Sequence, residues 1–277
     1  MTMTSSRLSV PDFRDTKARG ERLVVLTAYD ATMARLLDRA GVDALLVGDS
    51  LGMVVLGHDS TVPVTLDDMV HHTRAVVRGS TRALVIADMP FLTYQTGADD
   101  AVRNAGRLIQ DGGALAVKLE GGGTLVSIVE RIVAAGIPVM GHLGLLPQSI
   151  NQIGSYRKQA TGAADAARLL EDARALEAAG VFGIVLESIP AELAASVTAS
   201  VHVPTIGIGA GAECDGQVLV SYDMLGLFDG FVPSFVRQYA HLAEDVTSAA
   251  RQYADDVRRR QFPAAPLSVA DVDKARR

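Results

Sequence analysis

The sequence predicts a single α/β domain folded as a (β/α)8 TIM barrel. Five apolar runs of strand length each end in a polar side chain, and a helical pattern separates each run from the next. Such runs are typical of parallel strands that are buried on both faces. The 277 residues also suit an eight-unit barrel, which typically needs about 250. Active sites of these barrels lie at the carboxyl ends of the strands, so we expect an enzyme.

Each predicted element has its own signal. Glycines such as Gly41 follow the helical patterns, as expected for left-handed caps at helix ends. Thr65 is expected to cap the helix that begins at Leu66. The eight strands are expected at residues 23–30, 43–49, 83–88, 114–120, 138–142, 182–187, 204–208 and 217–222.

The end of the chain is expected to be a helical extension of the same domain. No change in composition marks a second domain, so residues 1–277 are predicted to form one domain with its core at about 20–240. The extension, 241–277, begins with a helix of mixed charge over 241–260. The polar, proline-containing tail after it is expected to be flexible.

Composition disfavours several classes of protein. A net charge of −6 gives no electrostatic footprint for nucleic acid. No apolar stretch approaches the roughly 18 residues of a membrane span, and the N-terminus lacks the apolar centre of a secretory signal. Cys214 is the only cysteine, which excludes an internal disulfide and fits a reducing compartment. We expect a cytoplasmic protein whose partners are small molecules and copies of itself.

Two carboxylates follow neighbouring predicted strands. Asp49 ends the second strand and Asp88 the third, so both can approach one point at the mouth of the barrel. Two carboxylates with water and substrate oxygens match the hard oxygen ligands that Mg²⁺ prefers. The alternative is that each caps the turn that follows it. The pair favours a metal or substrate site.

A lysine and a glutamate lie on the fourth predicted strand. Lys118 and Glu120 are two positions apart, so their side chains project from the same face. An ion pair between them would be costly to bury on the helix side of the strand. We therefore expect both residues at the mouth, paired with each other.

Two further polar groups end the fifth and sixth predicted strands. His142 lies between glycines, and a core histidine is as good an interpretation as a functional one. The apolar run before Glu187 is expected to bury this side chain partly and raise its pKa, as suits a general base. The alternative for Glu187 is an N-terminal cap for the helix that begins near Pro190. The repeated polar strand ends favour the base.

A glycine-rich stretch, residues 207–211, follows the seventh predicted strand. It either cradles an anion with its backbone amides or allows close backbone packing. Cys214, just beyond it, has no neighbouring base in sequence and is not expected to be a nucleophile.

Motifs spread along the chain closely resemble the ketopantoate hydroxymethyltransferase family, in order from about residue 7 to 262. They lie at residues 27–30, 47–53, 57–61, 63–65, 87–91, 117–122, 141–145, 147–148, 186–187, 206–211 and 215–217. The resemblance implies a (β/α)8 barrel that transfers a one-carbon unit from 5,10-methylenetetrahydrofolate to 3-methyl-2-oxobutanoate. The product would be 2-dehydropantoate, for pantothenate synthesis. Two places depart from the family pattern, Arg157 to Thr161 and Ser234.

The resemblance also implies roles for particular residues. It assigns Asp49 and Asp88 to a Mg²⁺ site with Glu120 nearby, and Glu187 to proton abstraction. Substrate contacts fall at Asp49, Ser50, Asp88, Lys118 and His142. Homo-oligomers, commonly decamers, are implied as well.

The implied chemistry agrees with what these side chains can do. Mg²⁺ bound to a 2-oxo acid polarises its carbonyl and acidifies the C–H at C3. Glu187 would take that proton, and Lys118 would stabilise the enolate or hold the substrate carboxylate. The enolate carbon would then attack the methylene carbon of the folate.

Two other functions compete with this one. A lyase of the phosphoenolpyruvate mutase and isocitrate lyase type is disfavoured because no Lys-Lys-Cys-Gly-His-like loop is present. An inactive barrel that binds metabolites or acts as a scaffold is disfavoured because every candidate group is present.

Overall fold

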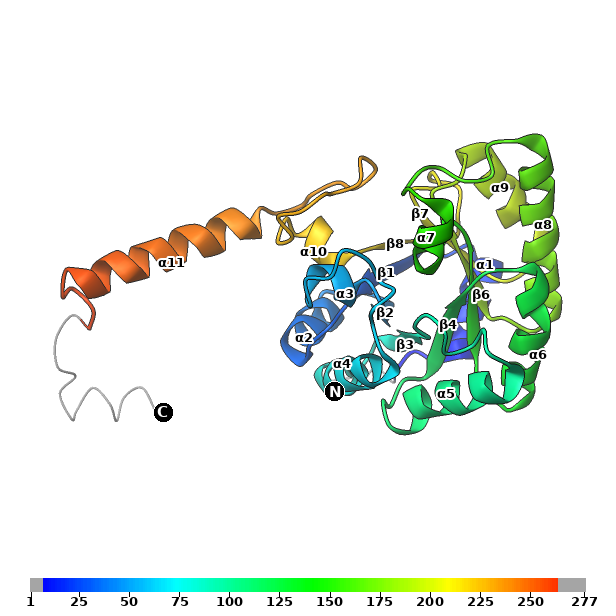
Figure 1. The fold of residues 1–277 in the computed structure, drawn as a ribbon, viewed down its shortest axis with the longest axis horizontal. Helices are drawn as coiled ribbons and strands as arrows, with labels where there is room; N and C mark the ends of the chain where they lie inside the picture. The colour runs from blue at the N-terminus through cyan, green and yellow to red at the C-terminus, as the bar shows by residue number, and fades with distance from the viewer. Residues whose placement is uncertain (1–6, 264–277) are drawn as a thin grey trace. The chain divides into compact units, whose positions relative to one another are not determined.

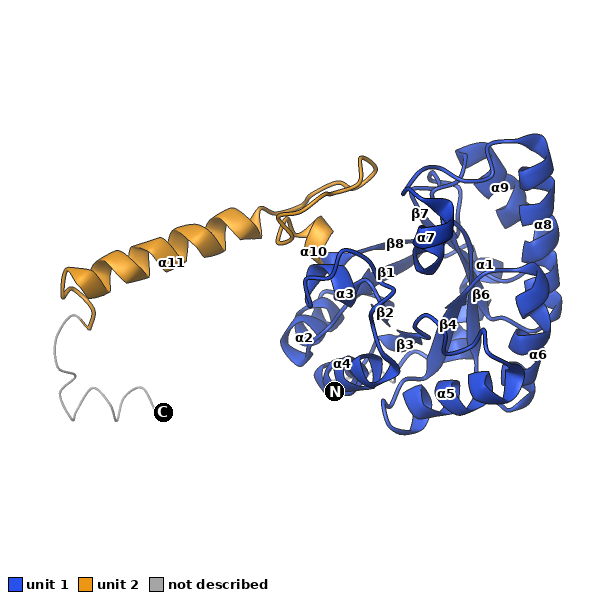
Figure 2. Cartoon of the chain, in the orientation of Figure 1, with its two compact units in different colours: residues 1–221 blue, residues 222–277 orange. Residues whose placement is uncertain are grey.

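The computed structural model describes residues 7–263 of the chain. The chain divides into two compact units, residues 1–221 and 222–277 (Figure 2). The first is called the barrel unit here and the second the C-terminal unit. Their boundary falls before residue 240, where the end of the core was expected. Most of the tail that was expected to be flexible lies outside the described residues.

Eight parallel strands close into a barrel in sequence order (Figure 1), which confirms the (β/α)8 prediction. Strand β8 pairs with β1, so the sheet has no open edge. Most of the predicted strands are longer than the observed ones, because the predicted bounds include loop residues beyond the hydrogen-bonded ladder. The strands are β1 (Leu23–Thr27), β2 (Ala44–Val47), β3 (Leu84–Asp88), β4 (Ala116–Glu120), β5 (Val139–Gly144), β6 (Gly183–Glu187), β7 (Thr205–Ile208) and β8 (Gly216–Leu219).

Helices pack around the strands of the barrel unit (Figure 1). They are α1 (Val10–Arg19), α2 (Ala31–Arg39), α3 (Leu51–Val54), α4 (Leu66–Gly79), α5 (Ala98–Gln110), η1 (Gly123–Leu125), α6 (Val126–Ala134), η2 (Pro147–Ser149), α7 (Ile150–Ile153), α8 (Ala163–Ala178) and α9 (Ala191–Ser200). As predicted, Thr65 caps α4, in a capping box with Asp68. Gly41 follows α2 with a φ of 88°, as expected for a left-handed residue beyond a helix end.

The last two helices are α10 (Ser221–Met224), which begins at the last residue of the barrel unit, and α11 (Leu242–Arg258) in the C-terminal unit. The observed α11 agrees with the helix expected over 241–260. No helix among residues 7–263 combines the length and apolar character that crossing a membrane requires.

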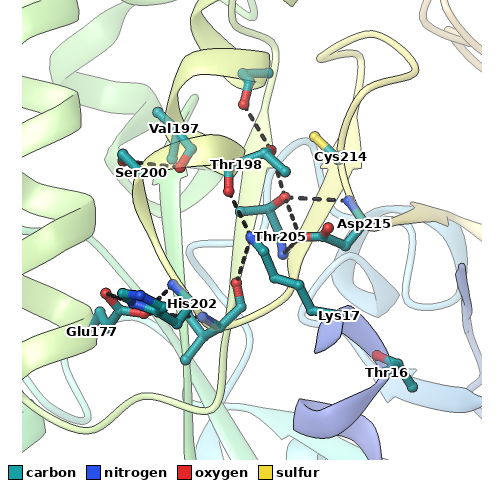
Figure 3. A network of polar contacts seen from close by, with 12 residues as sticks. Thr16, Lys17, Glu177, Val197, Thr198, Ser200, His202, Thr205, Cys214 and Asp215 are labelled. Carbon is teal, nitrogen blue, oxygen red and sulfur yellow. Dashed lines mark hydrogen bonds and ion pairs between the residues drawn. The ribbon is translucent and has the colours of Figure 1, made fainter. Parts of the chain in front are cut away.

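Helix α1 closes the amino end of the barrel. Phe13 is fully buried among inward-facing side chains from the first half of most strands, and its ring meets Phe182 edge to face at 5.5 Å. Lys17 attaches the same helix to the barrel, because its Nζ donates to the Thr198 carbonyl at 2.6 Å and lies 3.0 Å from Asp215 Oδ2 (Figure 3). This end of the barrel is therefore filled among the described residues.

The connection from β7 to β8, residues 209–215, contains no helix. Gly211 in the connection and Gly207 at the end of β7 allow it to pack closely. A Cβ atom on Gly211 would lie 2.6 Å from Ala191 Cβ, and one on Gly207 would lie 3.0 Å from Cys214 Sγ. Of the two interpretations of residues 207–211, these contacts favour close packing.

Candidate active site

Polar side chains from strands β2 to β6 gather at the carboxyl end of the barrel. Asp49 follows β2, Asp88 ends β3, and Lys118, Glu120 and His142 lie on β4 and β5. Each of these five residues is at most 4% exposed. Burial of so many ionisable groups is costly unless they compensate one another, so their mutual contacts determine what the site can do.

The closest ion pair in the group joins β3 to β4. Lys118 Nζ lies 2.9 Å from Asp88 Oδ1, and the two residues are partners in the strand register. The expected pair of Lys118 with Glu120 is therefore wrong. Residues two apart on one strand are about 7 Å apart, whereas neighbouring strands are about 4.8 Å apart. Burial alone would lower the pKa of Lys118, but the carboxylates of Asp88, Glu120 and Asp49 outweigh it and raise this pKa.

His142 connects the carboxylates of two strands. It is the register partner of Glu120, and its Nδ1 lies 3.5 Å from Glu120 Oε1 and 3.3 Å from Lys118 Nζ. Its Nε2 lies 3.2 Å from Glu187 Oε2. Burial and Lys118 favour the neutral ring, but hydrogen bonds to Glu120 and Glu187 outweigh them and raise the pKa of His142 to about 9. The two carboxylates therefore favour the protonated, positively charged ring.

Asp49 and Asp88 lie against each other. The backbone N–H of Asp49 donates to Asp88 Oδ2 at 3.1 Å, so the Asp88 carboxylate does not cap the turn that follows Asp88. Asp49 Oδ2 instead accepts from the side chain of Gln148 at 2.8 Å. Burial and the charges of Asp88 and Glu120 raise the pKa of Asp49 well above its ordinary value, and burial raises that of Asp88 although Lys118 opposes it. A bound cation would relieve this repulsion.

The site has an excess of carboxylates that suits a divalent cation. Lys118 and His142 bring two positive charges, whereas the two aspartates, Glu120 and Glu187 bring four negative ones when ionised. Asp88 Oδ1 is buried and makes no hydrogen bond of good geometry, although the Lys118 ammonium is near. A Cβ atom on Gly48 would lie 2.8 Å from Ser50 Oγ and 3.6 Å from Asp88 Oδ2, so a glycine keeps the space beside the carboxylate open.

The same residues limit how a metal could be held. Within residues 7–263, no group of three or more His, Cys, Asp or Glu side chains could hold a metal ion by itself. Glu120 accepts from the backbone N–H of Gln148 at 3.0 Å, and its place near the metal stays a prediction. Asp49 and Asp88 could supply two oxygen ligands, and water and substrate would supply the others. This donor set suits Mg²⁺, which usually retains several waters.

Comparison with known proteins decides which family carries this site. A sequence model of the family described as ketopantoate hydroxymethyltransferase matches residues 7–265. A 3-methyl-2-oxobutanoate hydroxymethyltransferase of Moorella thermoacetica is 60% identical over 258 residues, which cover 93% of this chain and 96% of that protein. Another from Chloroflexus aurantiacus is 57% identical over 257 residues, 93% of this chain and 91% of that one.

The chain belongs to the ketopantoate hydroxymethyltransferase family. Solved structures at lower identity show the shared barrel fold. A 2,3-dimethylmalate lyase of the PEP mutase/isocitrate lyase superfamily matches with a TM-score of 0.61 and 19% identity, covering 94% of this chain and 90% of that one. A phosphonopyruvate hydrolase in complex with oxalate and Mg²⁺ matches with a TM-score of 0.61 and 14% identity, covering 96% and 93%.

In this ketopantoate hydroxymethyltransferase family member, Glu187 is the most accessible of the strand-end carboxylates. Its side chain is 17% exposed, so the expected partial burial is observed. The alternative role as a helix cap is not, because α9 begins after Pro190 without any side-chain cap. Ser50 is half-buried, and its Oγ forms a 2.9 Å hydrogen bond with the hydroxyl of Tyr29. Both residues therefore have side-chain atoms available at the mouth.

Three residues near the site were not among the sequence-based candidates. Gln148 and Tyr94 are buried and contact Asp49 and Glu120, and Tyr156 directly precedes the stretch that departs from the family pattern. Burial and the negative charges of Glu187, Asp49 and Glu120 raise the pKa of Tyr156. Tyr94 and Tyr156 lie on loops and Gln148 on the short helix η2, all beyond the strands, where strand patterns give no signal. The signal in the sequence that could have pointed to Gln148 was its position within a family motif, residues 147–148.

Cys214 does not supply the catalytic cysteine that the lyase alternative would need. Cys214 is 1% exposed in the β7–β8 connection, and burial raises the pKa of its thiol. A buried thiol of this kind is inert.

Proposed function

We propose that this chain transfers a hydroxymethyl unit from 5,10-methylenetetrahydrofolate to 3-methyl-2-oxobutanoate and forms 2-dehydropantoate for pantothenate synthesis. The names of its close relatives supply the oxo acid and the reaction class. One structural observation carries the proposal. Glu187, a partly exposed carboxylate, faces the ammonium of Lys118 across the ring of His142. A candidate base and a cation thus lie at the same mouth of the barrel, on opposite sides of the His142 ring.

Asp49 and Asp88 would hold Mg²⁺, with Glu120 nearby. When bound, the cation polarises the carbonyl of the oxo acid, which makes the proton on C3 more acidic. Support comes from the raised pKa values of both aspartates and from the space beside Gly48. The phosphonopyruvate hydrolase of similar fold was solved with Mg²⁺, which is consistent with this choice of cation.

Residues of the chain would carry the proton and the charge. Glu187 accepts the proton from C3, and the neighbouring His142 Nε2 keeps its carboxylate oriented. Lys118 binds the carboxylate of the oxo acid or stabilises the negative charge of the enolate. Ser50, held by Tyr29, adds a hydrogen bond to the substrate.

Carbon transfer follows from the enolate. Its C3 forms a bond to the methylene carbon of the folate, and both bonds from that carbon to the folate nitrogens, N5 and N10, break. Each nitrogen takes up a proton, one that came from C3 and one from water. Water supplies the hydroxyl oxygen of the product, so the overall reaction consumes one water and releases tetrahydrofolate. We also propose that the protein acts in the cytoplasm as a homo-oligomer, a decamer by resemblance, whose size sedimentation would measure.

The proposal is tested by incubating the protein with Mg²⁺ and 3-methyl-2-oxobutanoate in D₂O, with and without 5,10-methylenetetrahydrofolate. We expect deuterium at C3 in both samples and 2-dehydropantoate only with the folate, as read by NMR and mass spectrometry. An inactive metabolite-binding barrel would bind the oxo acid without exchange. Absence of product in the presence of folate would overturn the proposal.

A further inference from the structure

The side chain of Gln148 is built into the floor of the candidate site. It lies on η2 after β5 and is buried. Its Nε2 donates to Asp49 Oδ2 at 2.8 Å and to the carbonyl of Met89 at 2.9 Å. Its Oε1 lies 2.7 Å from the hydroxyl of Tyr94. Every hydrogen-bonding group of the amide therefore has a partner except one lone pair of the oxygen.

Tyr94 sets the orientation of this amide. The backbone N–H of Glu120 lies 3.2 Å from the Tyr94 hydroxyl and can only donate to it. The hydroxyl hydrogen is then available for Gln148 Oε1, which is a closer acceptor than the Glu120 carbonyl at 3.2 Å. A flipped amide would place its oxygen against the two acceptors, Asp49 and the Met89 carbonyl. One orientation is thus strongly preferred.

The network reaches two of the carboxylates that surround the candidate cation site. The amide engages Oδ2 of Asp49, which leaves Oδ1 as the oxygen that the amide does not engage. The backbone N–H of Gln148 donates to Glu120 Oε2 at 3.0 Å. One residue therefore restrains carboxylates that arrive from β2 and from β4.

We propose that Gln148, oriented by Tyr94, is a positioning residue that holds Asp49 in a single rotamer with one oxygen directed at the cation and the oxo acid. The inference rests on the proposed function for the identity of these ligands. Partners that orient a metal ligand commonly change affinity or activity by about 10- to 100-fold when removed. A role limited to packing would change stability and leave cation affinity as it is.

Cation binding can be measured without turnover. Mn²⁺, which replaces Mg²⁺ at oxygen-rich sites, is titrated into the full-length protein, and free Mn²⁺ is read by electron paramagnetic resonance. We expect Gln148→Met to weaken Mn²⁺ binding by about 10- to 100-fold and Tyr94→Phe to weaken it less. The double variant should bind no more weakly than Gln148→Met alone, because Tyr94 acts through the amide.

A matched control removes a similar hydrogen bond, one made to the loop that carries Tyr94. Asn104 Nδ2 donates to the carbonyl of Thr93 at 2.7 Å, next to Tyr94, and makes no bond to a site carboxylate. Asn104→Ala should lower the melting temperature and leave Mn²⁺ affinity unchanged. Equal loss of affinity in this control would show that the effect is not specific to positioning and would overturn the inference.

The outcomes separate this inference from the proposed function. Unchanged Mn²⁺ affinity in folded Gln148→Met and Tyr94→Phe, with deuterium exchange intact in the wild type, overturns the positioning role alone. If Gln148→Met does not fold, Tyr94→Phe decides, because it keeps the ring that packs in the core. Failure of the wild type to bind Mn²⁺ and to exchange C3 overturns the proposed function, and the inference with it.

Discussion

Lys118 Nζ lies 2.9 Å from Asp88 Oδ1, and the two residues are direct register partners on β4 and β3. Glu120 and His142 are partners in the same way on β4 and β5. The charged groups of the candidate site are thus paired across the sheet and not along a strand. A one-residue insertion in β4 ahead of Lys118 would turn both of its charged side chains toward the helices.

The two aspartates should make the enzyme dependent on a divalent cation. Protein treated with chelator is expected to stay folded by circular dichroism, to lose activity and to recover with Mg²⁺. Asp49→Asn should weaken both cation and oxo-acid binding. Because this change removes a charge from a crowded group, it should leave the melting temperature of the metal-free protein equal to or above that of the wild type. Full activity in excess chelator would contradict the prediction.

Lys118→Met should lower turnover by a factor on the order of 10² to 10³, a typical loss for one electrostatic stabiliser. The change also leaves Asp88 buried beside other carboxylates, so we expect a loss of unfolding free energy of up to about 3 to 5 kcal/mol, less if Asp88 takes up a proton. The double variant Lys118→Met/Asp88→Asn should regain stability but not turnover. A single variant with the wild-type rate would make Lys118 a structural residue.

Glu187→Gln keeps the shape of the side chain but cannot accept a proton. We expect this variant to bind the oxo acid and to lose both C3 exchange and condensation by a factor on the order of 10² to 10⁴. NMR of the C3 proton in D₂O measures the exchange. Persistent exchange would transfer the role of base to another group, such as His142, and condensation without exchange would be incompatible with an enolate.

Two glycine-to-alanine changes test different properties: one should alter the KM for the oxo acid, and the other should alter the unfolding free energy. In Gly48→Ala the new methyl would meet Ser50 Oγ at 2.8 Å, so the Ser50–Tyr29 bond should break and KM for the oxo acid should rise. Gly106 lies within α5 with no atom near its missing Cβ, so Gly106→Ala should raise the unfolding free energy by about 0.5 to 1 kcal/mol. Equal KM values in the two variants would show that Gly48 does not open the site.

Asp38 should give the fold a pH-dependent contribution. Burial opposes its charge, but donors from the backbone of Thr81 and Ala83 and from the Thr81 hydroxyl lower the pKa below its ordinary 3.8. Its stabilisation is therefore complete above pH 3.8 and is lost as the pH falls through the lower pKa of the folded state. Asp38→Asn should cost about 1 to 3 kcal/mol at pH 7, and urea unfolding at pH 7 and pH 3 should show the gap between variant and wild type narrowing in acid.

The sequence was most informative where a strand imposes its own geometry. Short apolar runs that end in polar side chains, separated by helical patterns, predicted the barrel and the placement of Asp88, Lys118 and His142 at one end. The sequence wrongly predicted an ion pair between Lys118 and Glu120, because residue spacing within one strand says nothing of the register between strands. It did not indicate Gln148, whose contact with Asp49 joins loops 99 positions apart in sequence. Loop paths depend on tertiary packing, which short-range patterns do not contain.

Phe13 and its neighbours fill the amino end of the barrel. If the proposed reaction is correct, the oxo acid and the folate both reach the site from the carboxyl end, and the oxo acid binds next to the buried Lys118 and His142. We therefore expect ordered binding, in which the small oxo acid binds before the larger folate and tetrahydrofolate leaves before the hydroxymethylated product.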